Sequence, residues 1–232
     1  TGIHIGSYGT DVGSSLGKLV GTLVRRVDNV RFRLTSVEAT EVDERLAELL
    51  VSDSSRIAPH LHAPLQSGSN AILKRMGRNW YDAESYRAAI ARIFQGAETF
   101  ALAADVIAGF PGETEQDHRA TVQLIQDLPF NSLHVFPYSA RPGTSAVRLR
   151  NRVPAKVARE RSAELRTIAE EKKRCYEMSR LGGKCDVVVI ERGKGLTEDY
   201  LSVAVSEPSI PRRGRFHGTL RLEDGIVSAV PL

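Results

Sequence analysis

The feature that most constrains the fold is an alternation of strand-like and helix-like segments along the first 150 residues. Each predicted strand is a short run of apolar or alternating residues, and apolar residues at helical spacing follow it. The predicted strands cover residues 1–6, 30–34, 60–65, 100–107 and 132–136. Because helices separate consecutive strands and the loops are short, the pattern predicts an α/β fold with a parallel sheet and right-handed crossovers.

Polar residues mark the starts of several intervening helices. Ser14 or Ser15 can accept the first free N–H groups of the helix that follows. Two capping boxes are predicted further along the chain, formed by Thr40 with Asp43 and by Thr114 with Asp117.

The predicted pattern of secondary structure changes after Val153 and Pro154. One long helix is predicted over 154–181, and Gly182 and Gly183 end it. Short β segments follow at 186–191, 200–205, 215–222 and 226–230, separated by glycines and prolines. We therefore expect a partial α/β barrel over 1–150, a connecting long helix over 151–181, and a small all-β domain over 182–232.

Composition is ordinary for a globular protein, with 26% charged and 41% hydrophobic residues and a net charge of +4. The positive charge favours an anionic partner only weakly. No apolar run is long enough to span a bilayer, so we expect a cytoplasmic protein with no membrane partner. Cys175 and Cys185 are too few to ligate a four-cysteine cluster and are interpreted as incidental thiols.

The loops that follow the predicted strands are rich in glycine and in polar or charged residues that can bind a ligand. In a parallel α/β barrel such loops meet at the carboxyl ends of the strands, where functional groups collect. Glycine, serine, glutamine, carboxylate and arginine side chains suit a ligand that has an amine, a carboxylate and a ribose. The five loops cover residues 2–9, 34–38, 62–69, 105–114 and 135–144.

These loops, in this order, resemble the barrel of the radical S-adenosylmethionine tRNA methylthiotransferases. The phrases that carry the resemblance are TGIHIGSYG at 1–9, HLHAPLQSGS at 60–69, GFPGET at 109–114 and HVFPYSARPGT at 134–144, with LKRMGR at 73–78 between them. Four long phrases in the same order as in the family are specific evidence for the resemblance, whereas GFPGET alone would be weak evidence. The branch that acts on threonylcarbamoyladenosine beside the anticodon is favoured, and the isopentenyladenosine branch of the same family is the alternative.

The resemblance implies a radical-SAM-type barrel followed by a β-barrel RNA-binding domain of the TRAM type. The residues that it assigns to S-adenosylmethionine are Gly2, His4, Gly6, Ser36, Glu38, Gln66, Ser67, Asp105, Ile107 and Gly109. Arg141 would pair with a carboxylate or phosphate of the substrate. Arg212, Arg213 and Arg215 would bind the tRNA anticodon stem-loop.

The resemblance also implies cofactors that this chain does not ligate by itself. The family holds a [4Fe–4S] cluster through three cysteines just before the first strand seen here, and a second cluster in an N-terminal domain. We therefore expect a chain that is truncated, lacks the first barrel strand, has an unpaired sheet edge at 2–5, and is inactive alone. In the full-length enzyme an electron donor and S-adenosylmethionine would generate the 5′-deoxyadenosyl radical, and no catalytic residue is assigned within this chain.

Two readings from other classes remain open. A non-catalytic RNA-binding remnant would explain the missing cluster cysteines. A metal-dependent barrel hydrolase could use the H-x-H pair of His60 and His62, with Asp105 and His134 as further ligands. Against the hydrolase, no helix carries a ligand pair and His134 lies inside a predicted strand. Structural histidines beside a polar pocket are the favoured interpretation, and no metal ligand is assigned.

Overall fold

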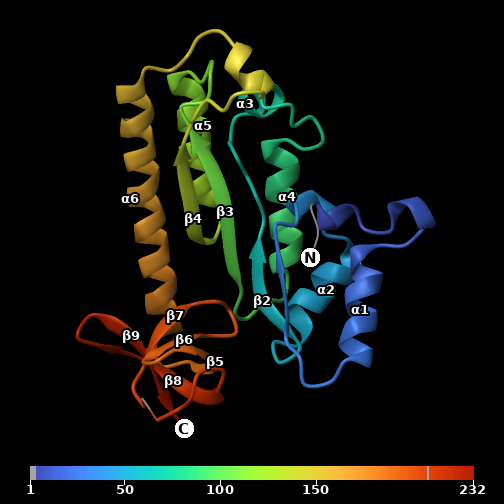
Figure 1. Cartoon of the computed structure of the whole chain (residues 1–232), viewed down its shortest axis with the longest axis vertical. Helices are drawn as coiled ribbons and strands as arrows, with labels where there is room; N and C mark the ends of the chain where they lie inside the picture. The colour runs from blue at the N-terminus through green and yellow to red at the C-terminus, as the bar shows by residue number, and fades with distance from the viewer. Residues whose placement is uncertain (1–3, 208) are drawn as a thin grey trace.

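The computed structural model describes residues 4–207 and 209–232, so Gly2 and the start of the first predicted strand lie outside the described residues. Two sheets organise the described chain (Figure 1): a four-stranded parallel sheet and a small closed barrel. The predicted α/β fold is confirmed. None of the described helices combines the length and the apolar character that spanning a membrane requires.

The parallel sheet has the strand order β1-β2-β3-β4, which is also the order along the chain. Its strands are β1 (Phe32–Thr35), β2 (Ile57–His62), β3 (Ala101–Ala108) and β4 (Phe130–Pro137). The connecting helices are α1 (Leu16–Arg26), α2 (Glu44–Ser52), α3 (Asn70–Arg75), α4 (Ala83–Phe94) and α5 (Glu115–Asp127). Every described pairing in this sheet is parallel, as helical crossovers require.

One face of the sheet forms the main core. Leu34, Leu61, Leu102 and Val106 are buried among the apolar stripes of the helices, in one continuous cluster. The opposite face is polar, because successive side chains of a strand point to opposite sides. A parallel sheet covered on both faces would have near-continuous apolar strands. Polar residues alternate with apolar ones in β1 and at the end of β2, so the face that carries these polar side chains is not packed into the main core.

Two of the three predicted helix caps are confirmed, and one is wrong. Ser15 caps α1, and the Thr114–Asp117 capping box at α5 is confirmed. The predicted box of Thr40 with Asp43 is wrong. Asp43 itself is the N-cap of α2 and accepts from the Leu46 N–H at 2.7 Å, because the residues before it form a short 3₁₀ turn over Ala39–Glu41.

The first predicted strand is wrong over its described residues. His4 has a φ of 58°, and Ile5–Ser7 is a 3₁₀ helix rather than a strand. A positive φ turns the chain away from the extended path that the alternating residues suggested. In the described sheet, β1 is the edge strand on the N-terminal side, and the described residues 4 and 5 are not part of the sheet.

The strand predicted at 60–65 begins earlier than expected, at Ile57, and it contains Pro59. A proline removes a ladder donor and is unusual in a central strand. Here the register between β1 and β2 shifts between Phe32 and Leu34, and the pairing with β3 starts only at His60. The missing N–H thus falls where neither neighbouring strand has regular pairing.

The long helix α6 (Ala155–Arg180) packs along β4 and leads into the small barrel (Figure 1). The barrel strands are β5 (Lys184–Glu191), β6 (Lys194–Leu196), β7 (Ser202–Val205), β8 (Arg215–Glu223) and β9 (Ile226–Pro231), closed in the order β5-β6-β7-β9-β8. This barrel has its own apolar core, which includes Val187 and Leu220. The short strand β6 was not predicted, and Tyr200 lies in a turn with a φ of 68° rather than in a strand.

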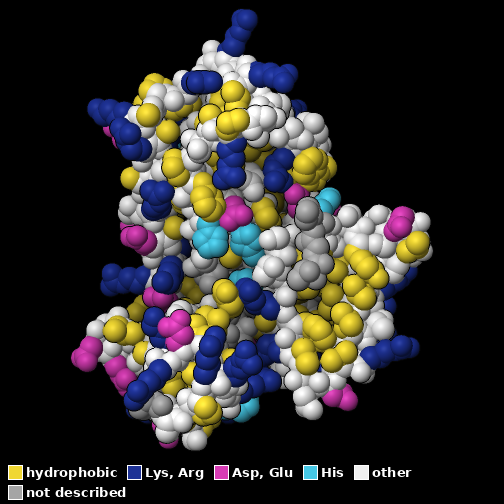
Figure 2. Space-filling model, viewed as in Figure 1, with side chains coloured by type: hydrophobic (Ala, Val, Ile, Leu, Met, Phe, Trp, Pro, Cys, Tyr) yellow, Lys and Arg dark blue, Asp and Glu magenta, His cyan; other side chains and the backbone are white. Residues whose placement is uncertain are grey.

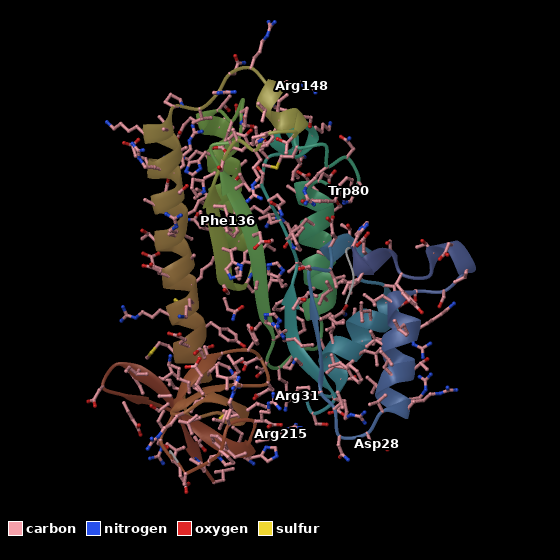
Figure 3. All side chains as sticks on the ribbon, in the orientation of Figure 1. Asp28, Arg31, Trp80, Phe136, Arg148 and Arg215 are labelled. Atoms are coloured by element: carbon pink, nitrogen blue, oxygen red, sulfur yellow. The ribbon has the colours of Figure 1, made fainter. Side chains whose placement is uncertain are left out.

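Buried ion pairs fix the small barrel to the rest of the molecule. Asp186 on β5 accepts from Arg215 on β8 and from Arg31, which precedes β1. Figure 3 shows Arg31 and Arg215 side by side at this junction. At the end of α6, Arg180 donates to the buried carboxylate of Asp199 at 2.7 Å. The position of the barrel is therefore held by charge as well as by packing.

Candidate functional site

Two of the sequence motifs form turns that build the site rather than line it. In GFPGET, the Gly109 N–H donates to both carboxylate oxygens of Glu113 at 3.1 Å, and Glu113 pairs with the buried Arg161 of α6 at 2.8 Å. A Cβ at Gly109 would lie 2.4 Å from the Cβ of Ala158, at a φ of +77°. Glycine is required there by both the close approach and the backbone angle.

The QSGS motif divides its residues between the core and the site. Ser67 is buried and bonds Thr121 of α5, while a Cβ at Gly68 would lie 2.6 Å from the Thr121 backbone. Gln66 has a φ of 65° and its carbonyl accepts from the Ile107 N–H at 2.9 Å. This bridge to β3 places Gln66 at the carboxyl ends of the strands.

The open face of the sheet carries a compact cluster of two histidines and a carboxylate. The Oδ1 atom of Asp105 lies 3.1 Å from Nε2 of His62 and 3.1 Å from Nδ1 of His134. These residues come from β2, β3 and β4, and Figure 2 shows histidines beside an acidic side chain in the middle of this face. The hydrogen bond from His62 lowers the pKa of Asp105, against a smaller opposing effect of burial and with help from His134.

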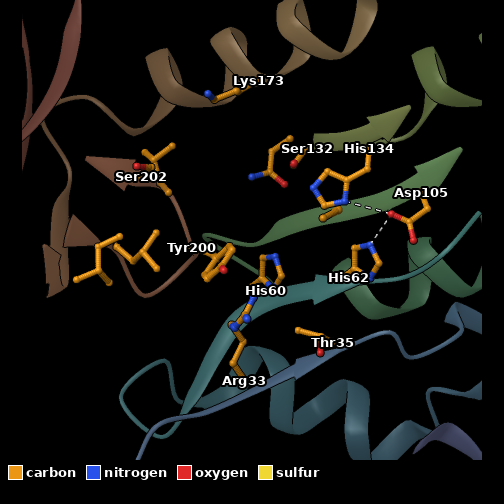
Figure 4. A pocket seen from close by; sticks show the side chains of 15 residues that line it. Arg33, Thr35, His60, His62, Asp105, Ser132, His134, Lys173, Tyr200 and Ser202 are labelled. Carbon is orange, nitrogen blue, oxygen red and sulfur yellow. Dashed lines mark hydrogen bonds and ion pairs between the residues drawn. The ribbon is translucent and has the colours of Figure 1, made fainter. Parts of the chain in front are cut away.

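A cavity of about 600 Å³ lies between this face, α6 and the small barrel (Figure 4). The Tyr200 ring from the barrel reaches toward the sheet, with its centroid 5.0 Å from that of His60 and 3.8 Å from the Arg33 guanidinium. Burial, followed by the charges of Arg33 and His62, lowers the pKa of His60 to about 4. Within the described part of the chain, Nδ1 of His60 and Oδ1 of Asn131 are buried without a hydrogen-bond partner.

A second cavity, of about 480 Å³, opens at the carboxyl ends of β3 and β4. Its lining residues are Gln66, Asp105, Ile107, Phe110, Phe136, Pro137, Tyr138, Ser139, Arg141, Thr144 and Ala146. Asp105 lines both cavities. The buried hydroxyl of Tyr138 has no hydrogen-bond partner among the described residues, and the Phe136 side chain is exposed on this face (Figure 3).

The structure brings together four of the residues assigned from the sequence. Gln66, Asp105, Ile107 and Arg141 all line the second cavity. One residue of this cavity that was not assigned, Phe136, could have been found from the sequence, because the alternation in the strand at 132–136 places it on the same face as His134.

The remaining assigned residues lie elsewhere or are engaged by other side chains. His4 contacts Glu41 at 2.5 Å, close to the position where a Cβ at Gly6 would collide with the Glu41 side chain. Glu38 pairs with Arg78 at 2.7 Å, and Ser36 is exposed with a φ of 58°. Ser67 and Gly109 belong to the turns described above.

The three assigned arginines of the small barrel differ in their surroundings. Arg212 is exposed, with its Nε donating to the carbonyl of Ile190 at 3.1 Å, and Arg213 is exposed with a φ of 69°. Arg215 is engaged with Asp186 at the junction. Arg212 and Arg213 are therefore the more available of the three to a polyanion.

Comparison with known proteins gives sequence relatives over nearly the whole chain. The chain is 35% identical over 203 residues to the threonylcarbamoyladenosine tRNA methylthiotransferase MtaB of Aquifex aeolicus, which covers 88% of this chain and 49% of that protein. It is 34% identical over 204 residues to the tRNA-2-methylthio-N(6)-dimethylallyladenosine synthase of Geobacillus kaustophilus, covering 87% of this chain and 38% of that protein. No protein-family model matches the chain.

A solved structure supports the fold. Coproporphyrinogen III oxidase (HemN) of Escherichia coli, described as a radical SAM enzyme, matches with a TM-score of 0.53 at 17% identity, over 67% of this chain and 36% of that one. The chain spans about half the length of the threonylcarbamoyladenosine relatives that it matches. By sequence, the chain is similar, over most of its own length, to about half of each of these tRNA methylthiotransferases.

Proposed function

We propose that this chain provides the S-adenosylmethionine-binding sheet and the RNA-binding barrel of an enzyme that adds a methylthio group to threonylcarbamoyladenosine in tRNA. The observation that carries the proposal is its relatedness: four curated relatives at 33–36% identity are named threonylcarbamoyladenosine tRNA methylthiotransferases. The modified nucleoside would be the one beside the anticodon. We propose that the protein acts on its tRNA in the cytoplasm.

The second cavity has the chemistry that S-adenosylmethionine requires. Ile107 and Phe136 offer apolar surface for a flat adenine ring, and ligand pockets of this kind combine apolar walls with a few placed polar groups. Gln66 and the unpartnered hydroxyl of Tyr138 can bond ribose hydroxyls. Arg141 can pair with a carboxylate, either of the cofactor or of the threonylcarbamoyl group. The residues present therefore fit the group.

The roles of this chain are binding, orientation and exclusion of water. When bound beside an iron–sulfur cluster, S-adenosylmethionine supplies the radical chemistry, with electrons from a donor protein. The Glu113–Arg161 pair fixes the turn after β3, so that Ile107 and Asp105 hold their places on the open face.

The small barrel is the proposed tRNA contact, of the TRAM type, and α6 is the proposed connector. Arg212 and Arg213 are exposed cations on a turn-rich β module. Phosphate neutralisation by such side chains gives affinity that falls with salt, and a stem-loop is recognised through its shape and backbone. Residues 1–150, 151–181 and 182–232 are the proposed functional divisions.

The test is the nucleoside content of tRNA from cells that lack the gene for this protein, measured by liquid chromatography and mass spectrometry. We expect the methylthio form of threonylcarbamoyladenosine to disappear and the unmethylthiolated nucleoside to accumulate. The dimethylallyl branch is the second candidate because a relative at 34% identity carries that name. Loss of the methylthio group from the dimethylallyl nucleoside instead would assign the protein to that branch, and an unchanged profile would reject both.

A further inference from the structure

We propose that His62, Asp105 and His134 form a binding site for a divalent transition-metal ion on the open face of the parallel sheet. It is the one such group found among the described residues: each side chain offers one ligand atom, and these atoms lie within 4.8 Å of one another. The inference goes beyond the proposed methylthiolation, since iron–sulfur clusters are held mainly by thiolates and this group contains none.

The spacing of the three ligand atoms suits one shared ion. Metal–nitrogen and metal–oxygen bonds to zinc-like ions are about 2.0–2.2 Å long, so ligands at octahedral or tetrahedral angles stand about 3.0–3.5 Å apart. The two nitrogen–oxygen distances here are both 3.1 Å, from Asp105 Oδ1 to His62 Nε2 and to His134 Nδ1. The two histidine nitrogens lie within 4.8 Å of each other, so to share one ion the histidine side chains would turn toward it.

The ligands stand on rigid, neighbouring strands. Asp105 on β3 is in register with His134 on β4, and His62 on β2 is in register with Ala103, two residues before Asp105 on the same face. Sites built on strands are more precise than sites built on loops. Figure 4 shows the three side chains converging from the three strands.

The surroundings leave room for further ligands of the ion. The group borders the 600 Å³ cavity, and His134 is exposed toward solvent, with a side-chain accessibility of 58%. The same cavity is lined by the unpartnered Nδ1 of His60 and Oδ1 of Asn131, and His60 is only 3% exposed. Buried polar atoms are normally bonded, so these two indicate that the cavity receives polar ligand atoms or water.

The donor set points to the chemical class of the ion. Two imidazoles and one carboxylate with open positions are typical of catalytic zinc and of non-haem Fe(II) sites. Calcium and magnesium prefer oxygen ligands throughout. We therefore expect binding of Zn²⁺, Fe²⁺ or Co²⁺ and no competition from Mg²⁺.

The test is a titration of tag-free, metal-free protein with Co²⁺, followed by visible absorption, and with Zn²⁺ by calorimetry. We expect one equivalent per chain in the parent, and affinity at least about tenfold weaker in Asp105→Asn and in His134→Ala. Both substitutions leave the buried core untouched. His217→Ala is the matched control, because His217 is an exposed histidine on the small barrel.

The result decides between an ion site and a hydrogen-bonded triad. No binding by the parent, or affinity unchanged in both Asp105→Asn and His134→Ala, would overturn the proposal. So would an equal loss in His217→Ala, since the ion would then be held by surface histidines. The titration contains neither S-adenosylmethionine nor RNA, so its failure is distinct from failure of the methylthiolation test.

Discussion

Replacing Arg161 by Met tests whether the GFPGET turn depends on its buried ion pair. In the parent, Nη1 of Arg161 donates to the Glu113 carboxylate at 2.8 Å and to the Glu113 carbonyl at 3.1 Å. The two side chains are 9% and 4% exposed. Methionine fills much of the same volume, but it leaves the carboxylate with the Gly109 N–H as its remaining partner in this turn.

The expected loss is large because a buried charge would remain without its counter-ion. Removing one partner of a buried pair costs about 3–5 kcal/mol, far more than the pair itself contributes when both partners are replaced. The free energy of unfolding, from urea denaturation followed by circular dichroism, should fall by that amount in Arg161→Met. Adding Glu113→Gln to Arg161→Met should recover part of the loss, because the uncompensated charge is then removed.

The matched control is Arg119→Met. Arg119 pairs with Glu115 and Glu164, but its side chain is 60% exposed, so its removal should leave the unfolding midpoint unchanged. A loss below about 1 kcal/mol in Arg161→Met would refute the reasoning, since the penalty for an uncompensated buried charge would then be absent. A loss just as large in the control would show that the assay responds to any arginine near this turn.

Three further predictions concern the thiols, the barrel junction and the RNA contact. Burial raises the pKa of Cys185 to about 11, so a thiol reagent at neutral pH should modify the exposed Cys175 quickly and Cys185 only after unfolding. Fast modification of both thiols in the folded protein would contradict this. Burial opposes ionisation of Asp186, but its arginine partners outweigh this effect and hold the pKa of Asp186 below the usual range. The ion pairs of Asp186 should therefore stabilise the fold at neutral pH, and this stabilisation should be lost as the pH falls through the lowered pKa. Thermal melts against pH should show a weaker acid dependence in Asp186→Asn, and identical curves would reject the assignment. Replacing Arg212 and Arg213 by Ala should weaken tRNA binding and flatten its salt dependence with the melting temperature unchanged; equal binding at low and moderate salt would place the RNA contact elsewhere.

The strands of the parallel sheet could be predicted because their physical signal is local. Apolar alternation and helix caps are short-range features, and Thr114 with Asp117 forms the capping box that its spacing indicates. The errors arise where tertiary context decides. Pro59 concealed the start of β2, because a proline is unusual inside a strand and here lies where the pairing with β1 shifts its register. The turn at His4 depends on a positive φ that no periodicity shows.

The candidate site could be predicted only in part, for a related reason. Polar residues of a loop can serve either a ligand or the loop itself, and the sequence does not name their partners. Ser67 and Glu113 are satisfied by Thr121 and Arg161, which lie far away in the sequence. The sequence offered His62, Asp105 and His134 as possible ligands together with His60, but which histidines meet Asp105 depends on the register of three strands.

The most direct test of the central claim is restoration of methylthiolation in cells that lack the gene, using variants of the protein at its natural length. Ile107→Glu places a charge in the second cavity, whereas Ile226→Glu changes an exposed apolar residue of the small barrel. With both variants accumulating to the level of the parent, Ile226→Glu should restore methylthio-threonylcarbamoyladenosine in tRNA and Ile107→Glu should not. Full restoration by Ile107→Glu would contradict the assignment of the active site to the open face of the sheet.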